Sequence, residues 1–91
     1  MSVTVRIPTI LRTYTDGESQ VSAQGETLSA VIDSLEGSFP GIKARVIDEQ
    51  GALRRFVNIY VGNDDVRFAD GLDTATPEGT QVSVIPAVAG G

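Results

Sequence analysis

Hydrophobic residues recur along the chain at two spacings, and each spacing predicts a different kind of element. Residues 2–7 alternate between apolar and polar, which is typical of a half-buried β-strand. Pro8 ends this strand because proline lacks the N–H that a sheet ladder requires. The Asp16-Gly17 pair predicts a turn, and residues 19–23 alternate again. The N-terminal part therefore predicts an antiparallel β-hairpin.

The next apolar residues follow the period of a helix. They fall at positions i, i+3, i+4 and i+7 and form one stripe: Leu28, Val31, Ile32 and Leu35. Thr27 precedes the stripe and is a favourable N-cap, because its hydroxyl can accept a bond from a free N–H of the first turn. Gly37 and Pro40 predict the end of the helix. Residues 41–48 predict one further short helical turn.

Three strands are predicted in the second half. Residues 56–61 are rich in β-branched and aromatic side chains, residues 66–68 follow a turn at 62–65, and residues 80–86 form the last strand. The resulting order is β-β-α-β-β-β, in which one helix covers one face of a mixed sheet. We therefore predict an α+β fold of the β-grasp, or ubiquitin-like, kind. The expected core includes Val5, Leu28, Ile32, Leu35, Ile59 and Val82.

Four side chains are predicted on the sheet face that the helix leaves uncovered: Arg6, Phe56, Tyr60 and Ile85. Two interpretations are open. A contiguous apolar patch on a surface marks a partner site, so this face can be a docking surface. Alternatively, a bent sheet buries its second face and these residues belong to the core. Arg6 can pair with an acidic residue of a partner or simply be solvated.

The composition argues against several classes of function. The 91 residues carry a net charge of −5, which argues against nucleic acid as a ligand. His and Cys are absent, so the usual general base and the soft metal ligands are missing, and we expect neither an enzyme nor a metal or cofactor site. Asp64-Asp65 lacks the spacing of an EF-hand. With no export signal, no membrane span and no disulfide, we expect a cytoplasmic monomer.

The C-terminal stretch is the one place where chemistry is expected. Residues 1–86 are predicted to form the domain, and residues 87–91 a flexible tail that ends in Gly90-Gly91. Small residues keep the tail slim: Ala87 and Ala89 flank Val88, and the two glycines follow. Glycine has no Cβ and adopts backbone angles closed to other residues, so such a tail can enter a narrow active site. The candidate reactive group is the Gly91 carboxylate.

These features together resemble the MoaD/ThiS family of ubiquitin-like sulfur carriers, and most of all its CysO type. The resemblance rests on the strand order, on residues 5–12 (VRIPTILR), 55–61 (RFVNIYV) and 65–68 (DVRF), and on the tail, residues 85–91 (IPAVAGG). It covers essentially the whole chain. It implies that the carrier is a protein co-substrate of other enzymes and is not itself a catalyst.

The resemblance also implies a reaction and partners. An E1-like enzyme uses ATP to adenylate the carboxylate of Gly91, and a sulfur donor then displaces AMP and leaves a thiocarboxylate. For the CysO type the implied acceptor is an activated serine derivative in a PLP-dependent cysteine synthase. A metalloprotease then releases cysteine from the carrier. In MoaD and ThiS the same end serves molybdopterin and thiamin thiazole.

Two other functions stay open from the sequence. The protein can be a modifier that is joined through Gly91 to lysines of target proteins, because the activation step is the same. It can also be a plain β-grasp interaction domain without covalent chemistry. Appending a residue after Gly91 would be harmless in the last case only.

Overall fold

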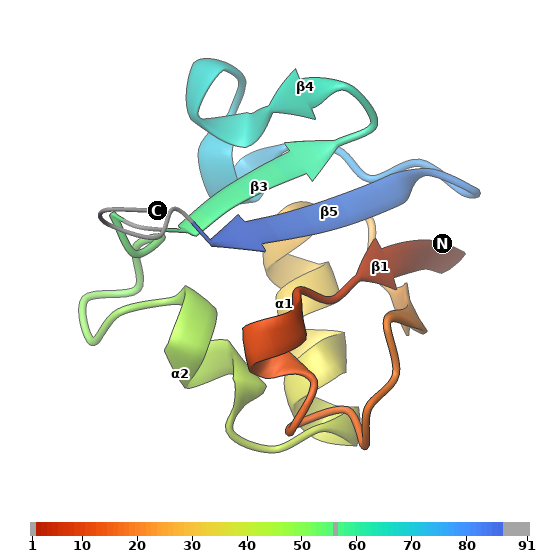
Figure 1. The fold of residues 1–91 in the computed structure, drawn as a ribbon. Helices are drawn as coiled ribbons and strands as arrows, with labels where there is room; N and C mark the ends of the chain where they lie inside the picture. The colour runs from red at the N-terminus through yellow and green to blue at the C-terminus, as the bar shows by residue number, and fades with distance from the viewer. Residues whose placement is uncertain (1, 56, 87–91) are drawn as a thin grey trace.

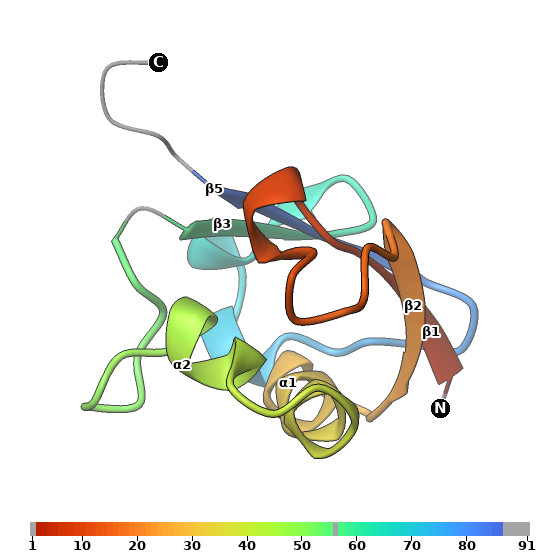
Figure 2. The ribbon, with the colours of Figure 1, turned by 60° about the horizontal axis from the view of Figure 1, so that its bottom comes forward.

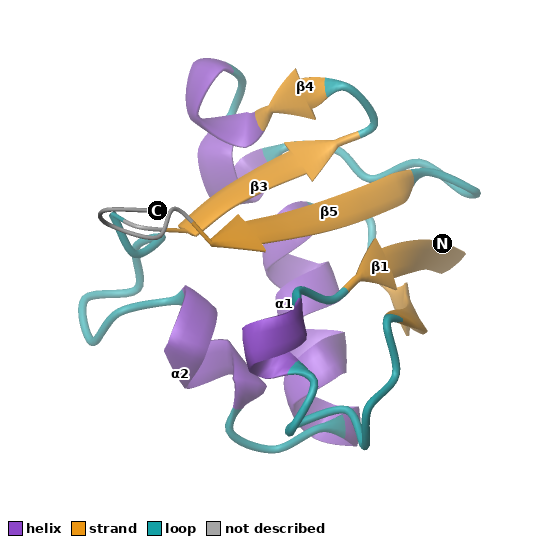
Figure 3. Ribbon diagram, viewed as in Figure 1, coloured by secondary structure: helices purple, strands orange, loops and turns teal. Residues whose placement is uncertain are grey.

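The computed structural model describes residues 2–55 and 57–86, in which a mixed β-sheet packs on one main helix (Figures 1 and 3). The strands are β1 (Ser2–Arg6), β2 (Gln20–Gln24), β3 (Val57–Val61), β4 (Asp64–Asp65) and β5 (Gln81–Pro86). The helices are α1 (Leu28–Ser38) and α2 (Ile42–Val46), with single 3-10 turns at η1 (Thr9–Leu11), η2 (Val66–Phe68) and η3 (Gly71–Asp73).

The sheet has the strand order β2-β1-β5-β3-β4. The last strand, β5, lies in the middle, parallel to β1 and antiparallel to β3. The register places Val82 opposite both Val5 and Val61, and Val5 opposite Val21, so one row of valines crosses four strands. This arrangement of a mixed sheet on one main helix confirms the predicted β-grasp fold.

One face of the sheet carries the core. Figure 2 shows α1 and α2 on the same side of the sheet. All six predicted core residues are buried: Val5, Leu28, Ile32, Leu35, Ile59 and Val82. At the start of α1, the Thr27 hydroxyl accepts a hydrogen bond of 3.3 Å from the Ala30 N–H, which confirms the predicted cap. The predicted short helical turn is α2.

One predicted strand is wrong. Val66–Phe68 is the 3-10 turn η2, and the two residues before it pair with β3 instead, as β4. The carboxylate of Asp65 accepts a 2.9 Å hydrogen bond from the Arg67 N–H. Aspartate that bonds a backbone N–H two residues ahead favours a turn over an extended chain. The predicted turn at 62–65 therefore shortens to Gly62-Asn63.

The end of α1 also differs from the prediction. Gly37 lies inside the helix, which continues to Ser38 and is capped by Phe39. A glycine is required instead at Gly41, the N-cap of α2. Its φ of 99° lies in the left-handed region, which most other residues avoid. Elsewhere the predicted strand limits differ from the observed ones by one residue, and Phe56 lies outside the described residues.

Candidate functional site

The described structure reaches the root of the expected tail but not the tail itself. Gly91 and the tail positions Ala87, Val88, Ala89 and Gly90 lie outside the described residues. Strand β5 leads to them, and its register with β3 extends to the pair Val57 and Pro86. On the other side, the pairing of β5 with β1 ends at Ser83, so β3 alone holds the point from which the tail starts.

Three of the four predicted docking residues lie on one face of the sheet. Arg6 and Tyr60 are both register partners of Ser83, so they lie on either side of β5 in one row. Ile85 follows two residues later on the same face, and 46% of its surface is exposed. This exposure argues against the interpretation that a bent sheet buries its second face. The fourth residue, Phe56, lies outside the described residues.

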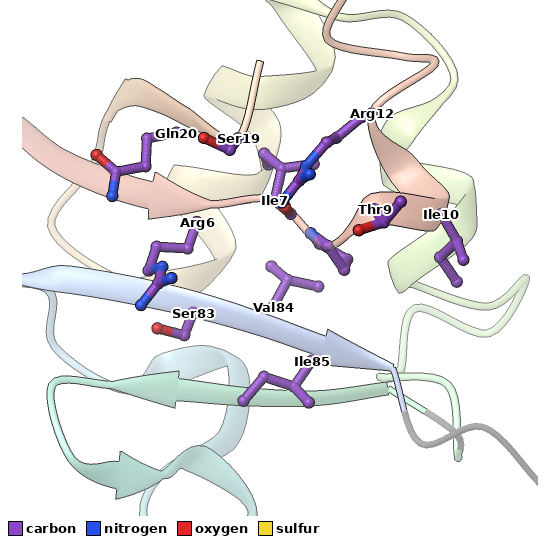
Figure 4. A pocket seen from close by; sticks show the side chains of 11 residues that line it. Arg6, Ile7, Thr9, Ile10, Arg12, Ser19, Gln20, Ser83, Val84 and Ile85 are labelled. Atoms are coloured by element: carbon purple, nitrogen blue, oxygen red, sulfur yellow. The ribbon is translucent and has the colours of Figure 1, made fainter. Parts of the chain in front are cut away.

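A hollow of about 500 Å³ opens where β1 ends beside β5 (Figure 4). It is lined by residues from three segments: Arg6–Ile10 with Arg12, Ser19 with Gln20, and Ser83–Ile85. Arg6 extends from β1 over β5 toward Ser83. Arg12 donates a 3.2 Å hydrogen bond from Nε to the carbonyl oxygen of Ile7. Two of the predicted docking residues, Arg6 and Ile85, thus share one concave site.

The sequence analysis did not single out two exposed side chains, Ile10 and Phe68, or the arginine that lines the hollow beside Arg6. Arg12 has no periodic signal, because it follows the irregular turn η1. Ile10 is 63% exposed beside buried Leu11, and Phe68 is 90% exposed. Adjacent apolar residues in a non-repeating segment do not reveal which of them faces solvent. The only available signal for Ile10 was its place two residues after Pro8, where the alternation has stopped.

Arg67 holds the start of β3 in place. Its Nη2 atom lies 2.6, 3.1 and 2.8 Å from the carbonyl oxygens of Arg54, Arg55 and Val57, respectively. Val57 is also the register partner of Pro86, the last residue before the tail. Arg67 therefore fixes the strand that lies beside the root of the tail.

Two carboxylates outside this face have lowered pKa values, and both accept hydrogen bonds from backbone N–H groups. Backbone hydrogen bonds from Gly41 and Lys43 lower the pKa of Glu36, and those from Ala52 and Gln50 lower the pKa of Asp48. In each case the bonds favour the charged carboxylate. These acids close the turns around α2 and do not face the hollow.

Within residues 2–55 and 57–86, no three acidic, His or Cys side chains gather as metal ligands would. The same residues contain no helix with the length and apolarity to cross a bilayer. Within the acidic pair at β4, Asp65 has a structural role, since its side chain caps η2.

Similarity to known proteins settles the family. The sequence profile described as the ThiS family matches residues 5–91, which is nearly the whole chain. The chain belongs to the ThiS family. Among ThiS-family relatives, the sulfur carrier protein CysO of Mycobacterium tuberculosis is 56% identical over 93 residues, covering 100% of both chains. The resemblance to MoaD/ThiS proteins of the CysO type is therefore confirmed.

Two further proteins are similar to this chain. The fold matches a chain in the crystal structure of the Amycolatopsis orientalis BexX/CysO complex with a TM-score of 0.92 and 50% identity, covering 98% of this chain and 99% of that one. Small archaeal modifier protein 3 of Haloferax volcanii is 40% identical over 65 residues, or 71% of this chain and 70% of that protein.

Proposed function

We propose that this protein is a sulfur carrier that holds sulfur as a thiocarboxylate at Gly91. The observation that carries the proposal is its 56% identity, over the full length of both chains, to a protein named as a sulfur carrier. The composition supports it. A chain without Cys has no thiol of its own to hold sulfur, and a chain without His lacks the usual general base.

The proposed chemistry takes place at the terminal carbonyl carbon. A carboxylate oxygen of Gly91 attacks the α-phosphorus of ATP and displaces pyrophosphate, which gives an acyl-adenylate. A sulfur nucleophile then attacks the carbonyl carbon, and AMP leaves with the former carboxylate oxygen. The product is a thiocarboxylate. ATP and the catalytic groups belong to an E1-like activating enzyme, and this chain supplies the carboxylate and the surfaces that position it.

The two parts of the chain have separate tasks in this scheme. The β-grasp body docks on the partner through the outer sheet face, where Arg6, Tyr60 and Ile85 lie and where we also expect Phe56. The tail, with Ala87 to Gly90 as its slim segment, enters the active site. The existence of a BexX/CysO complex for a relative supports docking of this body on a protein partner.

We further propose that the acceptor of the sulfur is an activated serine derivative, bound in a PLP-dependent cysteine synthase, and that a metalloprotease releases the cysteine. The similarity to CysO favours this route over the molybdopterin route of MoaD. Incubation of the thiocarboxylate form with O-phosphoserine and the synthase, followed by amino-acid analysis, tests it. Cysteine formed only after protease treatment is the expected result.

The sulfur-carrier proposal itself is tested by intact-mass measurement after incubation with ATP, sulfide and the activating enzyme. We expect a mass increase equal to the exchange of one oxygen for one sulfur. A matched chain with one alanine appended after Gly91 should gain nothing, because its terminal carboxylate is displaced from the position that the enzyme reads. Equal loading of the extended chain would contradict the proposal.

A second candidate function is that of a protein modifier. The 40% identity to small archaeal modifier protein 3 favours it specifically. Conjugates of this protein with target lysines would appear in a lysate blot as bands that resist reducing agents and are lost when Gly91 is deleted.

A further inference from the structure

The hollow at the end of β1 is positively charged on a protein with a net charge of −5. Arg6 and Arg12 line it, and none of the other lining residues is acidic. In residues 2–55 and 57–86, the only ion pair joins Lys43 to Asp33. Neither arginine of the hollow is therefore neutralised by a carboxylate of the described chain.

Both guanidinium groups are available for a ligand. Arg12 uses Nε to bond the Ile7 carbonyl oxygen, and this bond holds the group in place. Its two Nη atoms, and the whole guanidinium of Arg6, make no hydrogen bond with the described part of the chain. A planar guanidinium presents paired N–H donors that match the two oxygens of a carboxylate. Holding Arg12 in advance lowers the entropy lost when such a pair forms.

The walls of the hollow are suited to a protein surface rather than to a free anion. Ile10 on η1 and Ile85 on β5 flank it with exposed apolar area (Figure 4). A partner that covers these side chains excludes water, and charge pairs strengthen as water is removed. The volume of about 500 Å³ holds one or two partner side chains.

We propose that this hollow receives an aspartate or glutamate side chain of the enzyme that activates Gly91, with Arg6 and Arg12 as its two binding groups. The place of the hollow beside the root of the tail indicates which protein binds there. Ile85 immediately precedes Pro86, the last described residue before the tail, so an enzyme that encloses the tail also covers the hollow. The proposal rests on the proposed function, because it assigns the docking chemistry of that same reaction.

A carbodiimide, which joins an amine directly to a carboxylate, tests this contact. Lys43 is the only lysine of the chain, so a Lys43→Arg background removes the native side-chain amine. Arg6→Lys or Arg12→Lys then places a single lysine in the hollow while keeping its charge. Arg45→Lys in the same background is the matched control, because Arg45 lies on α2 and does not line the hollow.

We expect lysines at positions 6 and 12 to couple to aspartate or glutamate of the activating enzyme, with the linked peptides identified by tandem mass spectrometry. The control lysine at position 45 should couple far less. Equal coupling from all three positions, or none from positions 6 and 12, would overturn the proposal.

Affinity gives an independent measure. Arg6→Gln and Arg12→Gln should each raise the Kd for the enzyme about tenfold, in the range for loss of an important interface side chain. Lys43→Gln removes the same charge from α2 and should leave the Kd nearly unchanged. Arg12→Lys keeps the charge but loses the paired donors and the Nε bond to Ile7, so it should recover only part of the affinity. Equal unfolding midpoints for Arg12→Gln and the wild type exclude a loss of fold as the cause of weaker binding. The affinity of the wild type should also fall with added salt.

The two proposals fail in distinguishable ways. If the wild type binds the enzyme and acquires sulfur while Arg6→Gln and Arg12→Gln bind equally well, the arginine hollow is not a docking site and the carrier function stands. If the wild type acquires no sulfur, the carrier function itself is wrong.

Discussion

The two faces of the sheet belong to the same strands but differ in the burial and polarity of their side chains. On the inner face Val5 and Ile59 are fully buried against the helices. On the outer face their strand neighbours Arg6 and Tyr60 flank β5, and Ile85 is 46% exposed. The inner face supplies the burial that stabilises the fold. The outer face contributes little to that burial, so its side chains are free to serve a partner.

The comparison predicts its largest effect for truncation in the core. Leu35→Ala should lower the free energy of unfolding by about 2–5 kcal/mol, the range for removing a buried leucine side chain. Denaturant titration measures it. Ile85→Ala, a similar truncation on the outer face, should cost clearly less. If the two substitutions cost the same, the difference between the faces is not one of burial.

A smaller effect is expected at Arg67, which joins η2 to the start of β3. Arg67→Ala removes three hydrogen bonds to backbone carbonyls and should cost about 1–2 kcal/mol, because the group is exposed and water replaces part of the loss. Relative to the wild type, Arg67→Ala should exchange the amide hydrogen of Val57 faster, with a smaller change in β1. Unchanged exchange at Val57 would mean that Arg67 does not hold this strand.

One contribution to the pH dependence of stability comes from Glu36, at the end of α1. The pKa of Glu36 is lowered in the folded state by the N–H groups of Gly41 and Lys43. A lowered folded pKa stabilises the fold above the unfolded pKa, and this contribution is lost as pH falls through the folded value. Glu36→Gln should therefore flatten the stability profile below about pH 4. The same loss of stability on acidification in wild type and variant would exclude Glu36 as its source.

The smallest effect on stability is expected on the outer face itself. Ile85→Glu should change the free energy of unfolding by less than about 1 kcal/mol, the span of strand propensities. It should nevertheless weaken binding to the activating enzyme, because it places a carboxylate in the arginine hollow. Phe68→Glu is the control, since Phe68 is 90% exposed but does not line the hollow. An unfolded Ile85→Glu variant would show that this face is part of the core.

The inner face could be predicted from sequence because burial imposes a period. Alternation placed Val82 inward, and the helical stripe placed Leu28 and Leu35 against it. The turn at η2 could not be predicted in this way, since one hydrogen bond donated by the Arg67 N–H to Asp65 outweighs the strand propensity of Val66 and Phe68.

The site was predicted only where it follows strand alternation. Arg6 and Ile85 were assigned to the outer face correctly. Arg12 was not, because its place in the hollow depends on the path of η1 and on a contact with the Ile7 carbonyl. Arg67 was missed because its partners lie 10 to 13 residues away. Contacts made by irregular segments leave no periodic signal in the sequence.

The most direct test of the account compares the wild type with a chain that lacks Gly91. Deletion shortens an extended chain by up to about 3.6 Å, and displacements near 1 Å already cost about a hundredfold in rate. Both proteins are incubated with ATP, sulfide and the activating enzyme, and their C-terminal peptides are sequenced by mass spectrometry. The account predicts sulfur on the last residue of the wild type, none on the deletion variant, and equal unfolding midpoints for the two. Equal loading of both chains, or sulfur on an internal residue, would contradict it.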